Sequence, residues 1–297
     1  MNKTFLISTL IIVFLLTTLT PAISAADEGV NYVLIFQVTE YNSKIGDAAE
    51  YFFKSMLNPQ DNLFLLSPTQ LYNFSAQMRQ KYKLPDLISQ TEKVLKKDST
   101  MAAANYDQVL NAMTQVVTEI SNGTDSASGG MGGGVQTGTD IKQFMVQYRQ
   151  LMENLRQLRK LNENFFIDMA NKLKALPGKT YFYVIYEKEL KYTPTRGAID
   201  NLRQNPRYKF DAAELFEAES SEKIMDTDKV LQAFKDASIT FNFIYLNKQE
   251  KRRQGMEIKE FSGDVYNVFA TLANGTGGFV ESTSKPEAAL KKAGRPQ

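Results

Sequence analysis

The chain has 297 residues with no histidine, cysteine or tryptophan, and its 35 Lys and Arg nearly balance 33 Asp and Glu, leaving a formal charge of +2. The missing residue types exclude Ser-His-Asp and Cys-His nucleophiles, thiolate and imidazole metal ligands, disulfides and haem ligation by His or Cys. The balanced charge gives no electrostatic case for a nucleic-acid partner, and we expect none.

The first residues have the pattern of an export signal. Lys3 precedes the apolar run FLISTLIIVFLLTTL, and TPAISAAD supplies small residues for cleavage near Ala25 or Ala26. We therefore expect residues 1–25 to be a signal peptide and the mature protein to be secreted or periplasmic. The alternative is a retained membrane anchor, but an apolar core of about 15 residues is short for a span that needs about 20. Membrane contact is expected only if the signal is kept.

Five short apolar or aromatic runs predict the strands of a sheet. They are NYVLIFQV (31–38), NLFLLS (62–67), KTYFYVIYEK (179–188), SITFNFIYL (238–246) and GGFVES (277–282). Their nearly continuous apolarity favours strands buried on both faces of a parallel sheet. Helical periodicity in SKIGDAAEYFFKSML, TDKVLQAFKDA and FSGDVYNVFATLANG implies right-handed crossovers between strands. The predicted fold class is α/β, with a doubly wound, mainly parallel sheet.

A long helical insertion, from about residue 101 to 176, interrupts this order. It contains AAANYDQVLNAMTQVVTEIS, then the Gly-rich NGTDSASGGMGGGVQTGTD, then a helical pattern from Ile141 to Leu176. In the last piece apolar residues recur at steps of three and four, which predicts a seam for a partner helix with Asn162 as a polar, register-fixing position. A helix of this length would be about 54 Å long, so its first half should project and pair with the helix ending at Ser121. For its second half, an amphipathic helix lying on the sheet is the equal alternative.

The glycine run GGMGGG does not match a phosphate-binding loop. A P-loop requires Gly-Lys-Ser/Thr at the start of a helix, and a dinucleotide-binding turn requires glycines directly after a strand. We therefore predict that residues 122–139 form a disordered connector between two antiparallel helices.

Several segments together resemble the von Willebrand factor type A (VWA) family. TLANGTGGFVES followed by KPEAALKKA looks like the end of such a domain, while NYVLIFQVTEYNSKIGDAAEYF and DNLFLLSPTQLYNF lie where its first two strands are expected. More closely, YRQLMENLRQLRKLNENFFIDMANKLKALPGKTYFYVIYEKEL is similar to an exported bacterial group of VWA-related proteins. The resemblance covers most of residues 30–293 and implies one VWA-like α/β domain over residues 30–297.

The resemblance also implies a degenerate metal-ion-dependent adhesion site. The family's D-x-S-x-S motif falls on Gln37, Thr39 and Tyr41, where a neutral amide replaces the Asp and a bulky phenol replaces one Ser. We therefore expect no metal and no cofactor. An alternative oxygen cage from Glu40, Ser43 and Glu187 is the less favoured interpretation.

Ligands of open α/β sheets bind outside the carboxyl ends of the strands, which places the candidate partner-binding edge there. Its predicted residues are Thr39, Glu40, Asn42, Ser43, Ser67, Thr69 and Glu187. The implied function is non-catalytic protein-protein interaction or adhesion. The alternatives are a structural helical-hairpin scaffold and a carboxylate-based hydrolase, which would need two carboxyl groups about 5 to 9 Å apart in a cleft.

Two segments near the C-terminus carry further expectations. The basic stretch NKQEKRRQ at 247–254 is interpreted as a solvated loop rather than as a contact for an anionic surface. In the VWA-related group the chain continues beyond the helix that KPEAALKKA matches, whereas here it reaches GRPQ. We therefore expect exposed apolar surface near Phe279, Ala289 and Leu290, and possible self-association.

Overall fold

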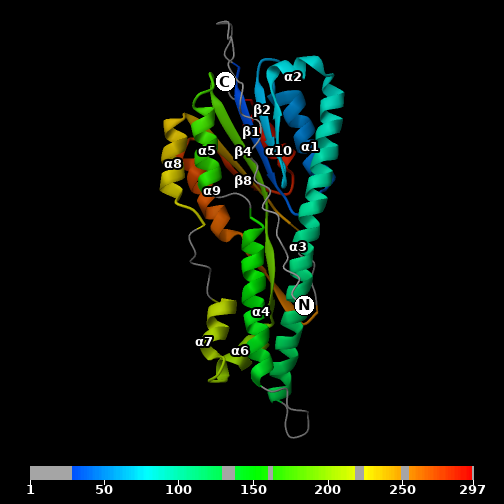
Figure 1. Ribbon diagram of the computed structural model, residues 1–297, viewed down its shortest axis with the longest axis vertical. Coiled ribbons are helices and arrows are strands. Elements are labelled where there is room, and N and C mark those ends of the chain that lie inside the picture. Colours follow the sequence, from blue (N-terminus) through cyan, green and yellow to red (C-terminus); the bar gives the residue numbers. More distant parts are fainter. Residues whose placement is uncertain (1–28, 129–137, 160–162, 218–223, 249–253, 296–297) are drawn as a thin grey trace, which may run out of the picture.

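A six-stranded sheet forms the centre of the computed structural model, which describes residues 29–128, 138–159, 163–217, 224–248 and 254–295 (Figure 1). Its strands are β1 (Asn31–Gln37), β2 (Asn62–Leu66), β3 (Leu71–Phe74), β4 (Thr180–Glu187), β6 (Ile239–Leu246) and β8 (Val280–Thr283). They lie in the order β3-β2-β1-β4-β6-β8, and every pair is parallel except β2 with β3. This is the 3-2-1-4-5-6 order of a doubly wound sheet with its outer strand reversed. The predicted α/β class with a mainly parallel sheet is confirmed.

Both faces of the sheet are covered, which explains why its strands are continuously apolar. Along β1, Tyr32, Leu34 and Phe36 point into one core while Val33 and Ile35 point into the other. The first core is covered by α1 (Ser43–Tyr51), the π-helical turn η1 (Phe52–Met56) and α10 (Pro286–Ala293). The second core is covered by α5 (Glu163–Leu173), α8 (Thr227–Asp236) and α9 (Gly263–Gly275).

A second lobe with its own core lies below the sheet in Figure 1. It combines most of α3 (Leu84–Ser128) with α4 (Gly138–Gln157), the antiparallel pair β5 (Leu190–Pro194) and β7 (Met256–Glu260), α6 (Arg196–Gln204), α7 (Lys209–Ala212) and the π-helical turn η2 (Ala213–Glu217). The short α2 (Ala76–Lys81) precedes α3. Because β5 directly follows β4 and β7 follows β6, this lobe lies against the carboxyl edge of the sheet.

One helix runs through both lobes. α3 has 45 residues, which corresponds to about 68 Å at the rise of an α-helix. Leu87 and Leu95 near its start pack in a core of the sheet, whereas Tyr106 to Ile120 pack in the core of the second lobe. α3 therefore fixes the second lobe to the sheet along most of the length of the molecule.

The helix expected from 141 to 176 consists of two helices. The first half pairs with another helix and the second half lies on the sheet, so each half follows a different interpretation. α4 pairs with α3 in the second lobe, as predicted for the first half. α5 lies on the sheet, with Phe166 and Met169 in its core, as the amphipathic alternative states. α4 ends at Gln157 and α5 begins at Glu163, and the side chain of Arg159, just after α4, lies in the junction between the lobes.

The predicted connector is shorter than expected. Residues 122–128 belong to α3 and residues 138–139 to α4, so the disorder expected for them is wrong. The remaining connector, 129–137, lies outside the described residues, as do Asn162 and the expected signal peptide, 1–25. Among the helices that the structure describes, none has both the length and the apolar composition to cross a membrane.

The short C-terminal helix is docked rather than exposed. Ala289 is 2% exposed and Leu290 is fully buried, and both pack with residues of α1 in a core of the sheet. Phe279 is half-buried. The expected exposure of Ala289 and Leu290 is therefore wrong, because both side chains pack in this core.

We predict that Gly278→Ala destabilises the fold. A Cβ at Gly278 would lie 1.9 Å from the carbonyl oxygen of Phe241, so the backbone must shift at a cost of about 1–3 kcal/mol in the free energy of unfolding. Gly197→Ala is the matched control, because its Cβ meets nothing within 4 Å inside α6; it should leave stability unchanged or raise it by roughly 0.5–1 kcal/mol. Urea unfolding of both variants checks this, and equal stabilities would contradict it.

Candidate functional site

The strand order reverses between β1 and β4, and in open α/β sheets ligands bind in the crevice outside the carboxyl ends of the strands at such a point. Three segments reach this crevice. Thr39 and Glu40 follow β1, Glu187 ends β4, and Lys248 follows β6. Residues from the ends of three separate strands thus meet in this crevice.

A group of polar side chains lies in the crevice. It consists of Thr39, Glu187 and Lys248 and is here called the Lys248 cluster. Glu187 as a residue is 3% exposed, and its Oε2 accepts from the backbone N of Thr39 at 2.7 Å and from the Thr39 hydroxyl. The Lys248 ammonium donates to Thr39 Oγ1 at 2.7 Å and to Glu187 Oε2 at 3.5 Å. It also lies 3.9 Å from a carboxylate oxygen of Glu40 and 5.6 Å from the ring centre of Tyr106 on α3.

The Lys248 ammonium supplies the positive charge that the buried carboxylate needs. A carboxylate removed from water is costly unless it is paired and hydrogen-bonded, and Glu187 has both kinds of partner. A cation entering the crevice would have to displace an ammonium that is already bonded to Thr39 and Glu187. The Lys248 ammonium thus occupies the position beside Glu187 that a bound cation would take.

A second polar group, here called the Arg159 cluster, joins the two lobes. The Arg159 guanidinium bonds Glu189 at 2.7 Å, Asp264 at 2.8 Å and the carbonyl oxygen of Phe261 at 2.6 Å, and it stacks 4.3 Å from the Phe261 ring centre. The Arg159 and Glu189 side chains are each 7% exposed. These partners come from the end of β4, the end of β7 and the first turn of α9.

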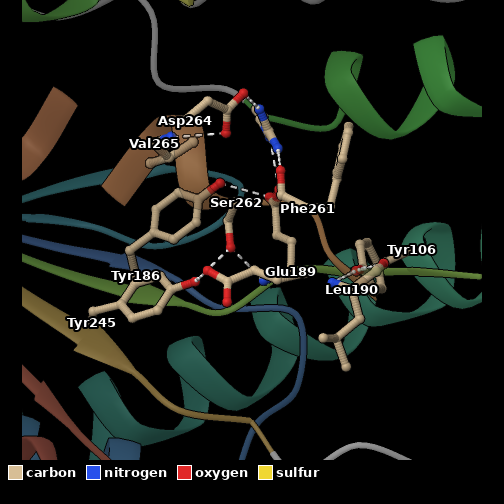
Figure 2. Close-up of polar contacts among 11 residues, drawn as sticks. Tyr106, Tyr186, Glu189, Leu190, Tyr245, Phe261, Ser262, Asp264 and Val265 are labelled. Carbon is tan, nitrogen blue, oxygen red and sulfur yellow. Dashed lines mark hydrogen bonds and ion pairs between the residues drawn. The ribbon is translucent and has the colours of Figure 1, made fainter. Parts of the chain in front are cut away.

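Tyrosines and a serine complete the Arg159 cluster (Figure 2). Tyr186 donates its hydroxyl to Glu189 Oε1 at 2.6 Å, and the backbone N of Glu189 donates to Ser262 Oγ at 2.9 Å. Ser262 Oγ also shares a 2.8 Å hydrogen bond with the hydroxyl of Tyr245. Nearby, the Tyr106 hydroxyl bonds both the backbone N and the carbonyl oxygen of Leu190, which ties α3 to β5. Each polar group in this junction is therefore held by another part of the chain.

Burial and charge shift the pKa values of the Arg159 cluster in a consistent way. Burial raises the pKa of the Glu189 carboxyl, while the Arg159 charge and the Tyr186 hydroxyl act against it. Burial lowers the pKa of Arg159, but Glu189, Tyr186 and Asp264 outweigh burial and raise it overall. Burial, and then the Glu189 charge, raise the pKa of Tyr186. Arg159 therefore stays charged and Tyr186 stays a hydroxyl donor, as a structural ion-pair cluster requires.

The space left beside this cluster is too small for a substrate. A cavity of about 10 Å³ is lined by Gln37, Arg159, Tyr186, Met225 and other side chains, and one water needs roughly 10–15 Å³ on this measure. Gln37, which the resemblance places at the first Asp of the metal motif, thus lies beside a guanidinium. Among the described residues no group of three or more His, Cys, Asp or Glu side chains is placed to hold a metal.

The predicted edge residues after β1 differ in accessibility. Glu40 and Ser43 are exposed, whereas Thr39 and Asn42 are half-buried. Asn42 is the N-cap of α1 but its side chain makes no capping bond, and its Oδ1 is buried without a hydrogen-bond partner among the described residues. Tyr41 donates its hydroxyl to Glu92 of α3 at 3.2 Å. Of these residues, Glu40 and Ser43 are therefore the ones that are well exposed to solvent.

The predicted residues after β2 are tied to α3. Ser67 is 2% exposed, and its hydroxyl bonds the Asp98 carboxylate and the carbonyl oxygen of Gln70. The backbone N of Thr69 donates to Ser67 Oγ at 3.3 Å. The structure thus brings Thr39, Glu40 and Glu187 together around Lys248, while Ser67 and Thr69 fix a turn to α3.

The key residues missed in the sequence are Lys248 and Arg159. Lys248 belongs to the basic stretch interpreted as a solvated loop, yet its side chain is only 17% exposed; residues 249–253 of that stretch lie outside the described residues. Glu187 and Glu189 lie near the metal position that the resemblance implies, but their cationic partners come from distant segments. Its position two residues after the end of a buried strand is the one signal that points to Lys248.

No family model matches the chain, and no curated protein sequence matches it.

We predict that Arg159→Met lowers the free energy of unfolding by about 3–5 kcal/mol, because it leaves Glu189 buried without its cation. The double variant Arg159→Met with Glu189→Gln should lose less than the sum of the two single changes, since it removes both buried charges. Lys172→Met, on the exposed side of α5, is the control for losing a cation. Urea unfolding measures the wild type and all four variants, and an Arg159→Met variant as stable as the control would contradict a structural role for the cluster.

Proposed function

We propose that this chain is an exported, non-catalytic domain of VWA type that mediates protein-protein interaction without metal. The Lys248 cluster is the observation that carries the proposal, because it closes the crevice where a ligand or metal would otherwise bind. The strand order, with its reversal between β1 and β4, supports the doubly wound arrangement that the sequence resemblance implies. Export rests on the sequence of residues 1–25.

The chemistry of the junction favours recognition over turnover. A glycosidase-like pair needs one carboxyl as acid and one as nucleophile or base around a cleft. Glu189 and Asp264 instead bind the same guanidinium, and the adjacent cavity is about 10 Å³. A hydrolase is therefore the least supported of the three functions, and binding through the surface the best supported.

Two surfaces can carry the interaction. Glu40 and Ser43 are exposed at the carboxyl edge, as the adhesion proposal requires. The scaffold alternative is favoured by the hairpin, where Met101 on α3 is 53% exposed and Val146 on α4 is 55% exposed. Both surfaces are testable with single substitutions that leave the buried clusters intact.

We predict that divalent metal neither binds nor is needed. Titration of the chain from residue 26 with Mg²⁺, Mn²⁺ and Ca²⁺ should give no saturable heat, because Lys248 already neutralises Glu187 and Gln37 supplies no charge for a cation. The melting temperature should be the same with and without chelator. A stoichiometric site with micromolar affinity would contradict this.

We predict that Ser43→Arg abolishes enrichment of a specific envelope protein by the immobilised chain, because Arg adds bulk and charge to the exposed edge. Quantitative mass spectrometry of wild type and variant, each with and without chelator, is the measurement. Val146→Arg places the same change on the hairpin, and Lys172→Glu is a control on α5. If only Val146→Arg abolishes the enrichment, the hairpin and not the edge is the binding surface, which favours the scaffold function. If neither variant abolishes it, both surfaces are rejected.

A further inference from the structure

An open pocket of about 410 Å³ lies between the end of the sheet and α10, away from the Lys248 cluster. Its volume is within the range of small-molecule sites, about 300–1,000 Å³. Tyr181 and Thr240, the second residues of β4 and β6, place it near the amino ends of these strands. The side chains that matter for its chemistry are Tyr181, Tyr183, Thr240, Asn242, Phe279 and Lys292.

The strand register gathers four of these side chains on one face. Tyr181 pairs with Thr240 and Tyr183 with Asn242 across β4 and β6, and alternate residues of a strand share a face. Further along the same face come aliphatic residues packed in the core with α1 and α10: Ile185, Ile244 and Leu246. The face therefore changes from aliphatic to hydroxyl and amide groups where the helices stop covering it.

Hydroxyl groups in this pocket have no partner among the described residues. Among the described residues, no side-chain hydrogen bond is made by Tyr181, Tyr183 or Thr240. Tyr183 as a residue is only 2% exposed. Burial raises the pKa of both tyrosines, so they are neutral hydroxyls. None of the three hydroxyls is among the buried polar atoms that lack a partner, so they are open to the pocket and can bond the hydroxyl groups of a ligand.

The remaining walls fix the shape and the charge of the pocket. Asn242 donates to the carbonyl oxygen of Phe182 at 3.0 Å and accepts from the backbone N of Phe279 at 3.3 Å, so its amide is held in place. At the rim Lys292 pairs with Glu281 at 2.8 Å, and the two charges offset each other. Gly277 has φ +75, and a Cβ at this position would meet no atom within 4 Å, so this wall stays open. The pocket is aromatic, rich in hydroxyls and free of excess charge.

We propose that this pocket binds a neutral sugar, of the size of a mono- or disaccharide. The C–H face of a sugar ring packs on aromatic rings, and its hydroxyls both donate to and accept from the hydroxyls of Tyr181, Tyr183 and Thr240. A purely apolar ligand would leave these hydroxyls unpaired, and an anion or cation would meet an ion pair that is already neutral. The pocket goes beyond the proposed interaction function and does not depend on it.

The test uses the chain from residue 26 with cellobiose, maltose and N,N′-diacetylchitobiose as probes, followed by saturation-transfer NMR and calorimetry. At least one disaccharide should bind saturably. Tyr181→Phe and Thr240→Val should each weaken it by roughly three- to tenfold, the effect of losing one hydrogen bond. The matched controls Tyr82→Phe and Thr271→Val, at exposed positions outside the pocket, should leave the affinity unchanged, and circular dichroism verifies the fold of each variant.

Three results would overturn the proposal. One is the absence of saturation transfer to all three disaccharides in the folded wild-type protein. Another is sugar binding that the Tyr181 and Thr240 variants leave unchanged, which would place it elsewhere. The third is equal affinity for 4-nitrophenol and its β-glucoside, which would show that the pocket recognises the aromatic ring and not the sugar.

Discussion

The pairing of the Arg159 guanidinium with Glu189 and Asp264 is the constraint on which the arrangement of the two lobes depends. A guanidinium and a carboxylate this deeply buried are tolerated only when every hydrogen-bonding direction is used. Here the partners come from the ends of β4 and β7 and the start of α9, and Arg159 itself lies between α4 and α5. Three segments that are distant in sequence, around residues 159, 189 and 261–264, therefore meet at one side chain, and moving either lobe would expose an unpaired charge.

The same junction explains why the carboxyl edge of this sheet is not an open cleft. The second lobe is built from segments that follow β3, β4 and β6, so it covers the edge where a doubly wound sheet usually binds its ligand. Lys248, which follows β6, then fills the remaining crevice between β1 and β4 with its ammonium. What remains accessible on that side is surface, such as Glu40 and Ser43. This is why a binding function follows from the geometry more readily than a catalytic one.

The sequence was sufficient for the central strands and insufficient for the junction, for physical reasons. β1, β4 and β6 are buried on both faces, so their apolar runs are continuous and easily seen. β3 and β7 are short and only partly buried, with mixed sequences such as MEIKE, and β5 was not separated from the loop after β4. The break near Arg159 was missed because the apolar spacing continues across it, while the ion pair that Arg159 makes there depends on a residue from another part of the chain. Lys248 was likewise missed, because its side chain bonds the carboxylate of Glu187, which lies 61 residues away in the chain.

The two ends of β4 and β6 therefore have opposite characters. At the carboxyl ends, Glu187 and the adjoining Glu189 are neutralised by Lys248 and Arg159, and the cavity beside Arg159 holds about one water at most. At the amino ends, tyrosine and threonine hydroxyls face an open pocket of about 410 Å³. Filling the usual ligand crevice with the chain's own ion pairs stabilises the junction but removes the space for a ligand. A ligand pocket on this fold therefore has to lie where the helices leave the sheet uncovered. On this sheet the uncovered region is at the amino ends of β4 and β6, opposite the crevice.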